Sequence, residues 1–113
     1  DTVFVHKAWH DNSETIKKIK FPMLADPTTK VCRKYQTLIA EEGLSLRATF
    51  LIDPDGILKA YEFHDNSIGR SSQELIRKIQ AAKFVKENHA VAGHNFNISR
   101  NGVFFTLPYI NHL

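Results

Sequence analysis

The sequence of 113 residues is poor in cysteine and has no long apolar run. Its single cysteine, Cys32, excludes an intrachain disulfide framework and, because zinc-binding thiolates occur in groups, a thiolate-type zinc site. No stretch approaches roughly eighteen consecutive apolar residues, and no basic segment followed by an apolar core opens the chain. Neither a membrane span nor a secretory signal is therefore visible, and we expect a cytoplasmic protein with no membrane partner.

The chain also lacks an initiator methionine, since its first residue is Asp1. This predicts a chain that is processed, truncated or excised from something longer. The length allows one domain at most.

Charge is almost missing from the C-terminal part. Of the 15 basic and 12 acidic side chains, all but Arg100 lie within residues 1–87. We therefore expect a globular part over residues 1–87 and a divergent tail of unknown role over residues 88–113. The formal net charge of +3 is spread over segments of mixed sign without a basic block, so we expect no nucleic-acid partner.

Apolar spacing and capping residues predict an α/β arrangement in which a hairpin precedes the last helix. The hairpin is indicated by two β-preferring runs around Asp53-Pro54-Asp55-Gly56, which has the residue preferences of a type I turn. The first run is nearly continuous in apolar residues, as in a strand covered on both faces. The expected elements are helices over residues 4–9, 11–19, 26–35 and 71–87, and strands over residues 21–25, 46–52 and 57–63.

Cys32 allows two interpretations. As a nucleophile, its thiolate would be favoured by the adjacent Arg33 and Lys34. As a packing residue, it would be a half-buried, inert thiol in the middle of a helix. The second interpretation is favoured, because small buried thiols are common and most are inert.

His6 and His10 have the four-residue spacing of metal ligands on one helix face, but no third ligand is evident. We expect two surface histidines, and neither a metal nor a cofactor.

Arg47 is the anomaly of the sequence, because it stands within a strand that otherwise looks buried. A guanidinium in such a place either pairs with a carboxylate or lines a cleft that holds an anion. Glu41 and Glu42 are the candidate partners for the structural alternative. The residues alone leave both alternatives open.

Several motifs follow one another in order along residues 1 to about 87. They are DTVFVHKAWH from Asp1, SETIKKIK from Ser13, ADPT from Ala25, EGL from Glu42, LRATF from Leu46, DPDG from Asp53 and IGR from Ile68. With these motifs the chain resembles the typical two-cysteine peroxiredoxins, most of all the bacterial alkyl hydroperoxide reductase C type. The resemblance implies the C-terminal portion of a thioredoxin-like fold, without its N-terminal strands and the helix that carries the peroxidatic cysteine.

The resemblance implies roles for two side chains and one strand. Arg47 matches the family's active-site arginine, whose planar fork of donors stabilises the thiolate and the peroxide oxygens. Trp9 matches an aromatic residue near the active-site pocket, although a plain core anchor fits it equally well. The strand 57–63 matches the one that pairs with its twin across the family's dimer, so a homodimer or higher oligomer is implied.

Two departures from the family decide what this chain is expected to do. Cys32 matches neither catalytic cysteine, and Val91-Ala92-Gly93 stands where the family has a Val-Cys-Pro resolving motif. The leading hypothesis is the peroxiredoxin activity, with a peroxide as substrate and a disulfide reductase as electron donor, and with the isolated chain inactive. The alternatives are a non-enzymatic truncated paralogue or fragment that acts as a dimerisation or interaction module, and a one-cysteine peroxidase that uses Cys32.

Overall fold

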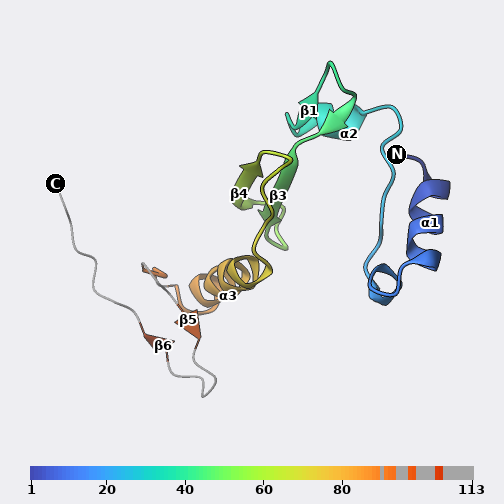
Figure 1. The fold of residues 1–113 in the computed structure, drawn as a ribbon. Coiled ribbons are helices and arrows are strands. Elements are labelled where there is room, and N and C mark those ends of the chain that lie inside the picture. The colour runs from blue at the N-terminus through green and yellow to red at the C-terminus, as the bar shows by residue number, and fades with distance from the viewer. Residues whose placement is uncertain (90, 94–96, 99–103, 106–113) are drawn as a thin grey trace. The chain divides into compact units, whose positions relative to one another are not determined.

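The computed structural model of the chain describes residues 1–89, 91–93, 97–98 and 104–105 (Figure 1). These residues form two compact units, Asp1–Leu46 and Arg47–Leu113, and each is described below by itself. The predicted boundary between residues 87 and 88 stays a prediction. Of the tail, a short antiparallel pair is described, β5 (Asn97–Ile98) with β6 (Phe104–Phe105).

The first unit begins with helix α1 (Val3–Asn12), which confirms the predicted helix. The Oγ1 atom of Thr2 accepts a hydrogen bond of 3.3 Å from the backbone N–H of Val5 and so caps the first turn. The short helix expected next is a single 3₁₀ turn, η1 (Ile16–Lys18). Ser13 lies just before it, and its Oγ atom accepts from the N–H of Ile16 at 3.2 Å.

Asp26 caps helix α2 (Lys30–Lys34), but the helix begins later than the sequence predicts. A turn closed by the 3.0 Å bond from Thr29 N–H to Asp26 O comes first, and Thr29 has a left-handed φ of 58°. The Asp26 carboxylate reaches across this turn to accept from the N–H groups of Val31 at 3.2 Å and Cys32 at 2.9 Å. These bonds hold the pKa of the Asp26 carboxyl below its usual value, and the bond from Cys32 has the largest effect.

The predicted strand over residues 21–25 was wrong, because those residues are in extended or bent backbone without ladder pairing. A strand is defined by its hydrogen-bonded neighbour, and none of the described residues pairs with this segment. The sequence did not predict the two-residue strands β1 (Leu38–Ile39) and β2 (Leu44–Ser45), which pair in antiparallel fashion. Gly43, with a φ of +65°, lies in the turn that joins them.

Thr37 links helix α2 to the β1–β2 pair through hydrogen bonds. Its Oγ1 atom donates to Cys32 O at 3.3 Å and accepts from Ser45 Oγ at 2.8 Å. Its own carbonyl accepts from the N–H of Leu46 at 2.8 Å. At 4% exposure, Thr37 is the one buried polar residue among those whose burial is described. A polar side chain can be buried here because its polar atoms form hydrogen bonds within the unit.

The second unit is built on the predicted hairpin, now β3 (Arg47–Ile52) and β4 (Leu58–His64), paired from Arg47 opposite His64 to Ile52 opposite Leu58. The turn is as predicted: Gly56 N–H donates to Asp53 O at 2.9 Å. The Asp53 carboxylate accepts from the N–H groups of Asp55 and Ile57, each at 2.9 Å. Gly56 takes a φ of +79°, which favours glycine.

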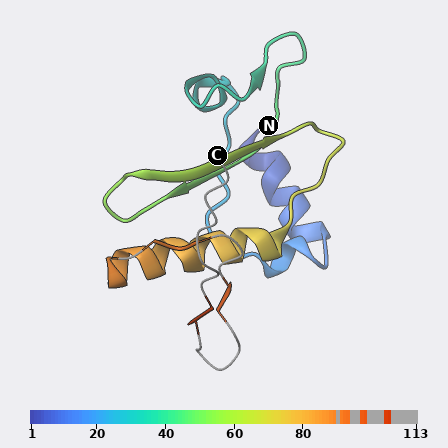
Figure 2. The same ribbon diagram turned by 90° about the vertical axis from the view of Figure 1, so that its left-hand side faces the viewer.

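Helix α3 (Ser72–Asn88) follows the hairpin and confirms the helix predicted over residues 71–87. Ser71 caps its first turn, since Ser71 Oγ accepts from Glu74 N–H at 3.2 Å. The helix runs along the hairpin in Figure 2. Lys78 Nζ donates to Glu62 Oε2 at 3.1 Å, and Lys86 Nζ donates to Asp55 Oδ2 at 3.0 Å. These two ion pairs link α3 to the middle and to the turn of the hairpin.

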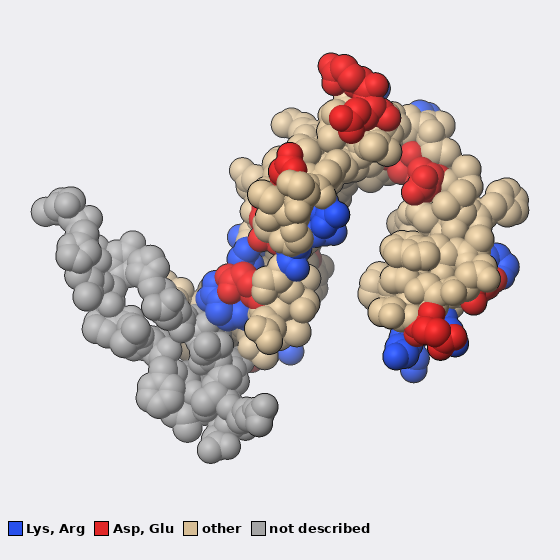
Figure 3. All heavy atoms as spheres, viewed as in Figure 1, with Lys and Arg blue, Asp and Glu red and all other residues tan. Residues whose placement is uncertain are grey.

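Burial is sparse in both units. The prediction that strand 46–52 is covered on both faces was wrong, because β3 is at most half-buried along its length. Neither α1 nor α3 contains a buried residue. Figure 3 shows mainly uncharged surface, with the acidic side chains at the β1–β2 turn standing out in red. No helix within the described residues is long and apolar enough to cross a bilayer.

Replacing Ser71 by alanine should weaken the start of α3 by about 1 kcal/mol, because Glu74 N–H loses its acceptor. We expect the amide of Glu74 to exchange about fivefold faster, as measured by hydrogen exchange and NMR. Ser72→Ala, one residue further along, is the control and should leave that rate unchanged. Equal effects of the two substitutions would contradict the capping role of Ser71.

Candidate functional site around Arg47

Arg47 is the first residue of β3, and its side chain is exposed. It forms no ion pair within 4.0 Å with any residue that the structure describes. Glu41 and Glu42 are exposed at the β1–β2 turn, and neither forms an ion pair within the described ranges. Because Glu41 and Glu42 belong to the first unit and Arg47 begins the second, the alternative of an ion pair between them stays a prediction.

The groups near Arg47 come from the end of β4 and the loop after it. His64 lies opposite Arg47 in the hairpin register, and its Nδ1 atom is 3.2 Å from Gly69 O, to which a protonated Nδ1 donates. Asp65 Oδ1 accepts from both the N–H and the hydroxyl of Ser67. These Ser67 bonds, and the more distant positive charge of Arg47, hold the pKa of the Asp65 carboxyl below its usual value.

Arg70 ties this loop back to β3. Its NH1 nitrogen donates to Ala48 O at 2.7 Å and lies 3.3 Å from Thr49 Oγ1. The two arginines, 47 and 70, thus belong to the same end of the hairpin, one at the strand's first residue and one bound to its second and third. The reasoning from residues did not assign a role to Arg70, and the signal that was present is the Ile68-Gly69-Arg70 motif, which carries a basic residue directly before a helix cap.

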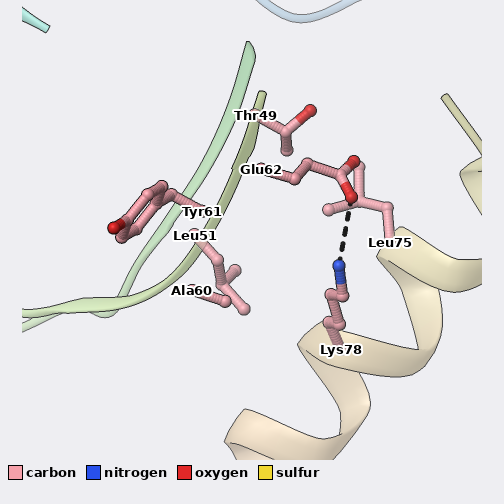
Figure 4. Close-up of a pocket in the computed structure, with 7 residues that line it drawn as sticks. All are labelled: Thr49, Leu51, Ala60, Tyr61, Glu62, Leu75 and Lys78. Atoms are coloured by element: carbon pink, nitrogen blue, oxygen red, sulfur yellow. Dashed lines mark hydrogen bonds and ion pairs between the residues drawn. The ribbon is translucent and has the colours of Figure 1, made fainter. Parts of the chain in front are cut away.

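The hairpin is positioned on α3 by Glu62. Its Oε2 atom accepts from Lys78 Nζ at 3.1 Å and lies 3.6 Å from His64 Nε2 (Figure 4). Lys78 is the main cause that holds the pKa of the Glu62 carboxyl below its usual value. Because His64 is also the register partner of Arg47, the same carboxylate connects α3 to the strand end that presents the guanidinium.

A shallow pocket separates α3 from the hairpin. Figure 4 shows Thr49, Leu51, Ala60 and Glu62 turned toward the helix, whereas Tyr61 points to the opposite side of the sheet. The lining residues are Thr49, Leu51, Ala60, Tyr61, Glu62, Leu75 and Lys78. With space for about one water molecule (≈ 10 Å³), this pocket is a packing gap and not a substrate site.

Trp9 and Cys32 lie in the first unit. Trp9 is 54% exposed on α1, and Cys32 is half-buried in α2. The backbone N–H of Cys32 donates to the Asp26 carboxylate at 2.9 Å, and its carbonyl accepts from Thr37 Oγ1 at 3.3 Å. The assigned roles of Arg47 and Trp9 stay predictions.

The histidines form no metal centre in the part of the chain that the structure describes, since no three His, Cys, Asp or Glu side chains converge there. His6 Nε2 is 4.0 Å from Asp1 Oδ2, and His10 Nε2 is 3.4 Å from Ile19 O. The two residues thus have separate neighbours.

The order of elements and the position of Arg47 define the chain as an α/β portion of a thioredoxin-like domain, with a hairpin whose one face is covered by the following helix. A family model described as "AhpC/TSA family" matches residues 1–61, a stretch that contains Trp9, Cys32 and Arg47. The chain belongs to this family.

Curated relatives agree with this assignment. Alkyl hydroperoxide reductase C of Staphylococcus haemolyticus is 47% identical over 88 residues, which are 78% of this chain and 47% of that protein. The protein of the same name from Salmonella typhimurium is 51% identical over 85 residues, 75% of this chain and 46% of that protein. The chain thus spans about half the length of the curated relatives it matches.

Solved structures show the same coverage. Enterococcus faecalis AhpC superposes with a TM-score of 0.75 at 47% identity, over 80% of this chain and 54% of that chain. The reduced 2-Cys peroxiredoxin of Plasmodium vivax gives a TM-score of 0.81 at 30% identity, over 92% of this chain and 54% of that chain. These neighbours confirm the predicted fold class, an α/β portion of the thioredoxin-like peroxiredoxin fold.

Replacing Lys78 by methionine should raise the pKa of Glu62 toward its ordinary value, because the main cause of its lowering is removed. With Lys78 present, the Glu62–Lys78 pair contributes its full stabilisation at pH values above the ordinary glutamate pKa. This stabilisation is lost as the pH falls through the lowered pKa of Glu62. The measurement is a carboxyl ¹³C titration followed by NMR. Lys83→Met on the same helix is the control, and a Glu62 pKa that shifts equally in both variants would contradict the assignment.

Proposed function

We propose that this chain provides the arginine-bearing portion of a thiol-dependent peroxidase that reduces hydrogen peroxide and organic hydroperoxides in the cytoplasm. The observation that carries this proposal is the exposed guanidinium of Arg47, unpaired among the described residues, within the stretch that the AhpC/TSA model matches. The relatives' name, alkyl hydroperoxide reductase C, supports the substrate class.

The chemistry of that reaction explains why a free arginine is useful. A cysteine thiolate attacks one oxygen of the peroxide, an S–O bond forms, and the O–O bond breaks. Sulfur is oxidised to a sulfenic acid, and the peroxide is reduced to an alcohol or water once the leaving oxygen takes a proton. Arg47 would donate hydrogen bonds to the peroxide oxygens and stabilise negative charge on sulfur and on the leaving oxygen. A disulfide reductase would then return the sulfenic acid to the thiol.

The nucleophile of this reaction is not Cys32 in our proposal. Cys32 donates its backbone N–H to the Asp26 carboxylate at 2.9 Å, and by the resemblance it matches neither of the family's catalytic cysteines. Since the sequence holds no other cysteine, the isolated chain supplies the arginine without a reactive thiolate. The proposed assembly is a homodimer or higher oligomer through the strand of residues 57–63.

A second candidate function, a non-enzymatic interaction module, is favoured by a different observation. Large apolar side chains remain exposed on both units, among them Leu24 at 85% in the first unit and Tyr61 at 62% in the second. Surfaces of this kind mark sites of association with other chains. This function differs from the first in that it requires no role for Arg47.

We expect the isolated chain to show no peroxidase activity above that of free cysteine. Stopped-flow mixing with hydrogen peroxide should give slow consumption, and Cys32→Ser should abolish even that slow stoichiometric oxidation. Rapid, stoichiometric oxidation of Cys32, at rates well above those of free cysteine, would instead establish the one-cysteine peroxidase.

The role of Arg47 is tested in a chimera in which the matched residues of this chain replace their counterparts in the Salmonella typhimurium relative. Arg47→Lys should lower kcat/KM for an alkyl hydroperoxide by about 10²–10³, because lysine lacks the planar fork of donors. Arg33→Lys in α2 is the matched control and should leave kcat/KM unchanged. A chimera that stays fully active with lysine at position 47 would favour the interaction module.

A further inference from the structure

His64 is the last residue of β4 and lies directly opposite Arg47, the first residue of β3. Side chains directly opposite each other in an antiparallel pair share a face of the sheet, with Cβ atoms about 4.5–5.5 Å apart. Glu62, two residues before His64, lies on this face as well and is turned toward α3 (Figure 4). His64 is thus the neighbour in the sheet both of the residue that carries the guanidinium and of the residue that binds α3.

Each ring nitrogen of the half-buried His64 faces an oxygen that can only accept. Nδ1 is 3.2 Å from Gly69 O, and Nε2 is 3.6 Å from Glu62 Oε2. The Glu62 carboxyl stays ionised because Lys78 holds its pKa below the usual value. A neutral imidazole has one N–H and one lone pair, so in either tautomer the lone pair faces one of the two oxygens. Only the imidazolium presents an N–H to both.

The two oxygens belong to different parts of the second unit. Glu62 Oε2 also accepts from Lys78 Nζ at 3.1 Å, which connects this contact to α3. Gly69 lies in the loop between β4 and α3, directly before Arg70, whose NH1 nitrogen donates to Ala48 O at 2.7 Å. The imidazolium therefore links the sheet to the same loop that Arg70 links to β3, and both links meet at the strand end that carries Arg47.

Charged groups of both signs lie on the elements around His64. They are Glu62 on β4, Arg47 on β3, Lys78 on α3, and Asp65 and Arg70 in the loop that follows β4. The two carboxylates favour the imidazolium, and the three cations oppose it. Among the described residues, Glu62 is the only acidic group within 4.0 Å of the ring, so this carboxylate stabilises the proton on Nε2 at the shortest range.

We propose that His64 is a positioning residue for Arg47: its imidazolium bridges Glu62 and Gly69 O and thereby holds the strand end that presents the guanidinium. This inference rests on the proposed function, since it concerns the same arginine. When the ring loses its proton, one of the two contacts is lost, and the loop and the start of β3 are held less tightly. Histidine side chains change charge between about pH 5 and pH 8, so the presentation of Arg47 depends on pH in this range.

The first test is an NMR titration of the full ¹⁵N-labelled chain from about pH 5 to about pH 8. The backbone amide signals of Arg47 and Gly69 should shift with the same midpoint as the ring signals of His64. In His64→Asn the side-chain amide can still donate to Gly69 O but cannot become charged, so these shifts should disappear. His89→Asn, at the C-cap of α3, is the matched control and should leave them unchanged. Shifts of the Arg47 amide that persist in His64→Asn, or that are missing in the unchanged chain, would overturn the proposal.

The second test measures kcat/KM for an alkyl hydroperoxide in the chimera with the Salmonella typhimurium relative, with His64 and with His64→Asn. The attacking thiolate titrates in both proteins, so the ratio of the two kcat/KM values isolates the contribution of His64. We expect a ratio of about three to five near pH 5, the size expected for one partly exposed ion pair, and a fall toward one near pH 8. A ratio that does not change with pH would mean that His64 acts by packing alone and would contradict the proposal.

Arg47→Lys in the same chimera separates this inference from the proposed function. If Arg47→Lys lowers kcat/KM while the ratio for His64 stays constant with pH, the peroxidase proposal stands and the positioning role of His64 is wrong. If Arg47→Lys leaves kcat/KM unchanged, the proposed role of Arg47 in the reaction is wrong. The NMR titration of the full chain then still decides whether the charge of His64 holds the strand end, because it does not depend on activity.

Discussion

The antiparallel pairing of β3 with β4 is the interaction on which the second unit depends. It fixes the register that sets Arg47 opposite His64 and leaves Thr49, Leu51, Ala60 and Glu62 on the side of α3. Because side chains alternate along a strand, the same register turns Tyr61 and Phe63 to the other side. A slip of one residue would exchange the two faces, turn Glu62 away from Lys78 and turn the aromatic residues toward the helix.

Polar contacts, more than burial, hold the described residues in place. In the first unit Thr37 bonds both to α2 and to the β1–β2 pair, and the Asp26 carboxylate caps α2 across a turn. In the second unit Glu62, Asp55 and Arg70 join elements that are distant in sequence. Such exposed pairs contribute little stability each, since water and salt screen them. A domain is normally stabilised by apolar burial, and here the apolar side chains that would supply it are largely exposed.

Much of the local structure was readable from the residues. The helix start at Ser71, the turn Asp53–Gly56 and the amphipathic helix after it have strong short-range signals, and all three are present. The expectation for residues 21–25 failed because a strand needs a neighbour, and apolar composition does not say whether one is there. The late start of α2 was missed since the left-handed conformation of Thr29 cannot be read from a non-glycine residue. In the candidate site, Arg47 could be selected from the sequence because it stands in an apolar strand. The hydrogen bond from Arg70 to Ala48 could not be predicted, because it joins residues that are 22 positions apart.

The sequence by itself determined the family, the single cysteine and the arginine within the strand, because motif order, composition and a charge among apolar residues are properties of the chain and not of its packing. Only the tertiary structure decided that the Arg47 side chain is exposed, that the backbone N–H of Cys32 donates to a carboxylate, and that one face of the hairpin is packed on α3 while the other carries exposed aromatic rings. The physical reason is the same in each case: charge pairing and burial are set by which residues approach through space, and sequence spacing dictates that approach only within a turn or a helix.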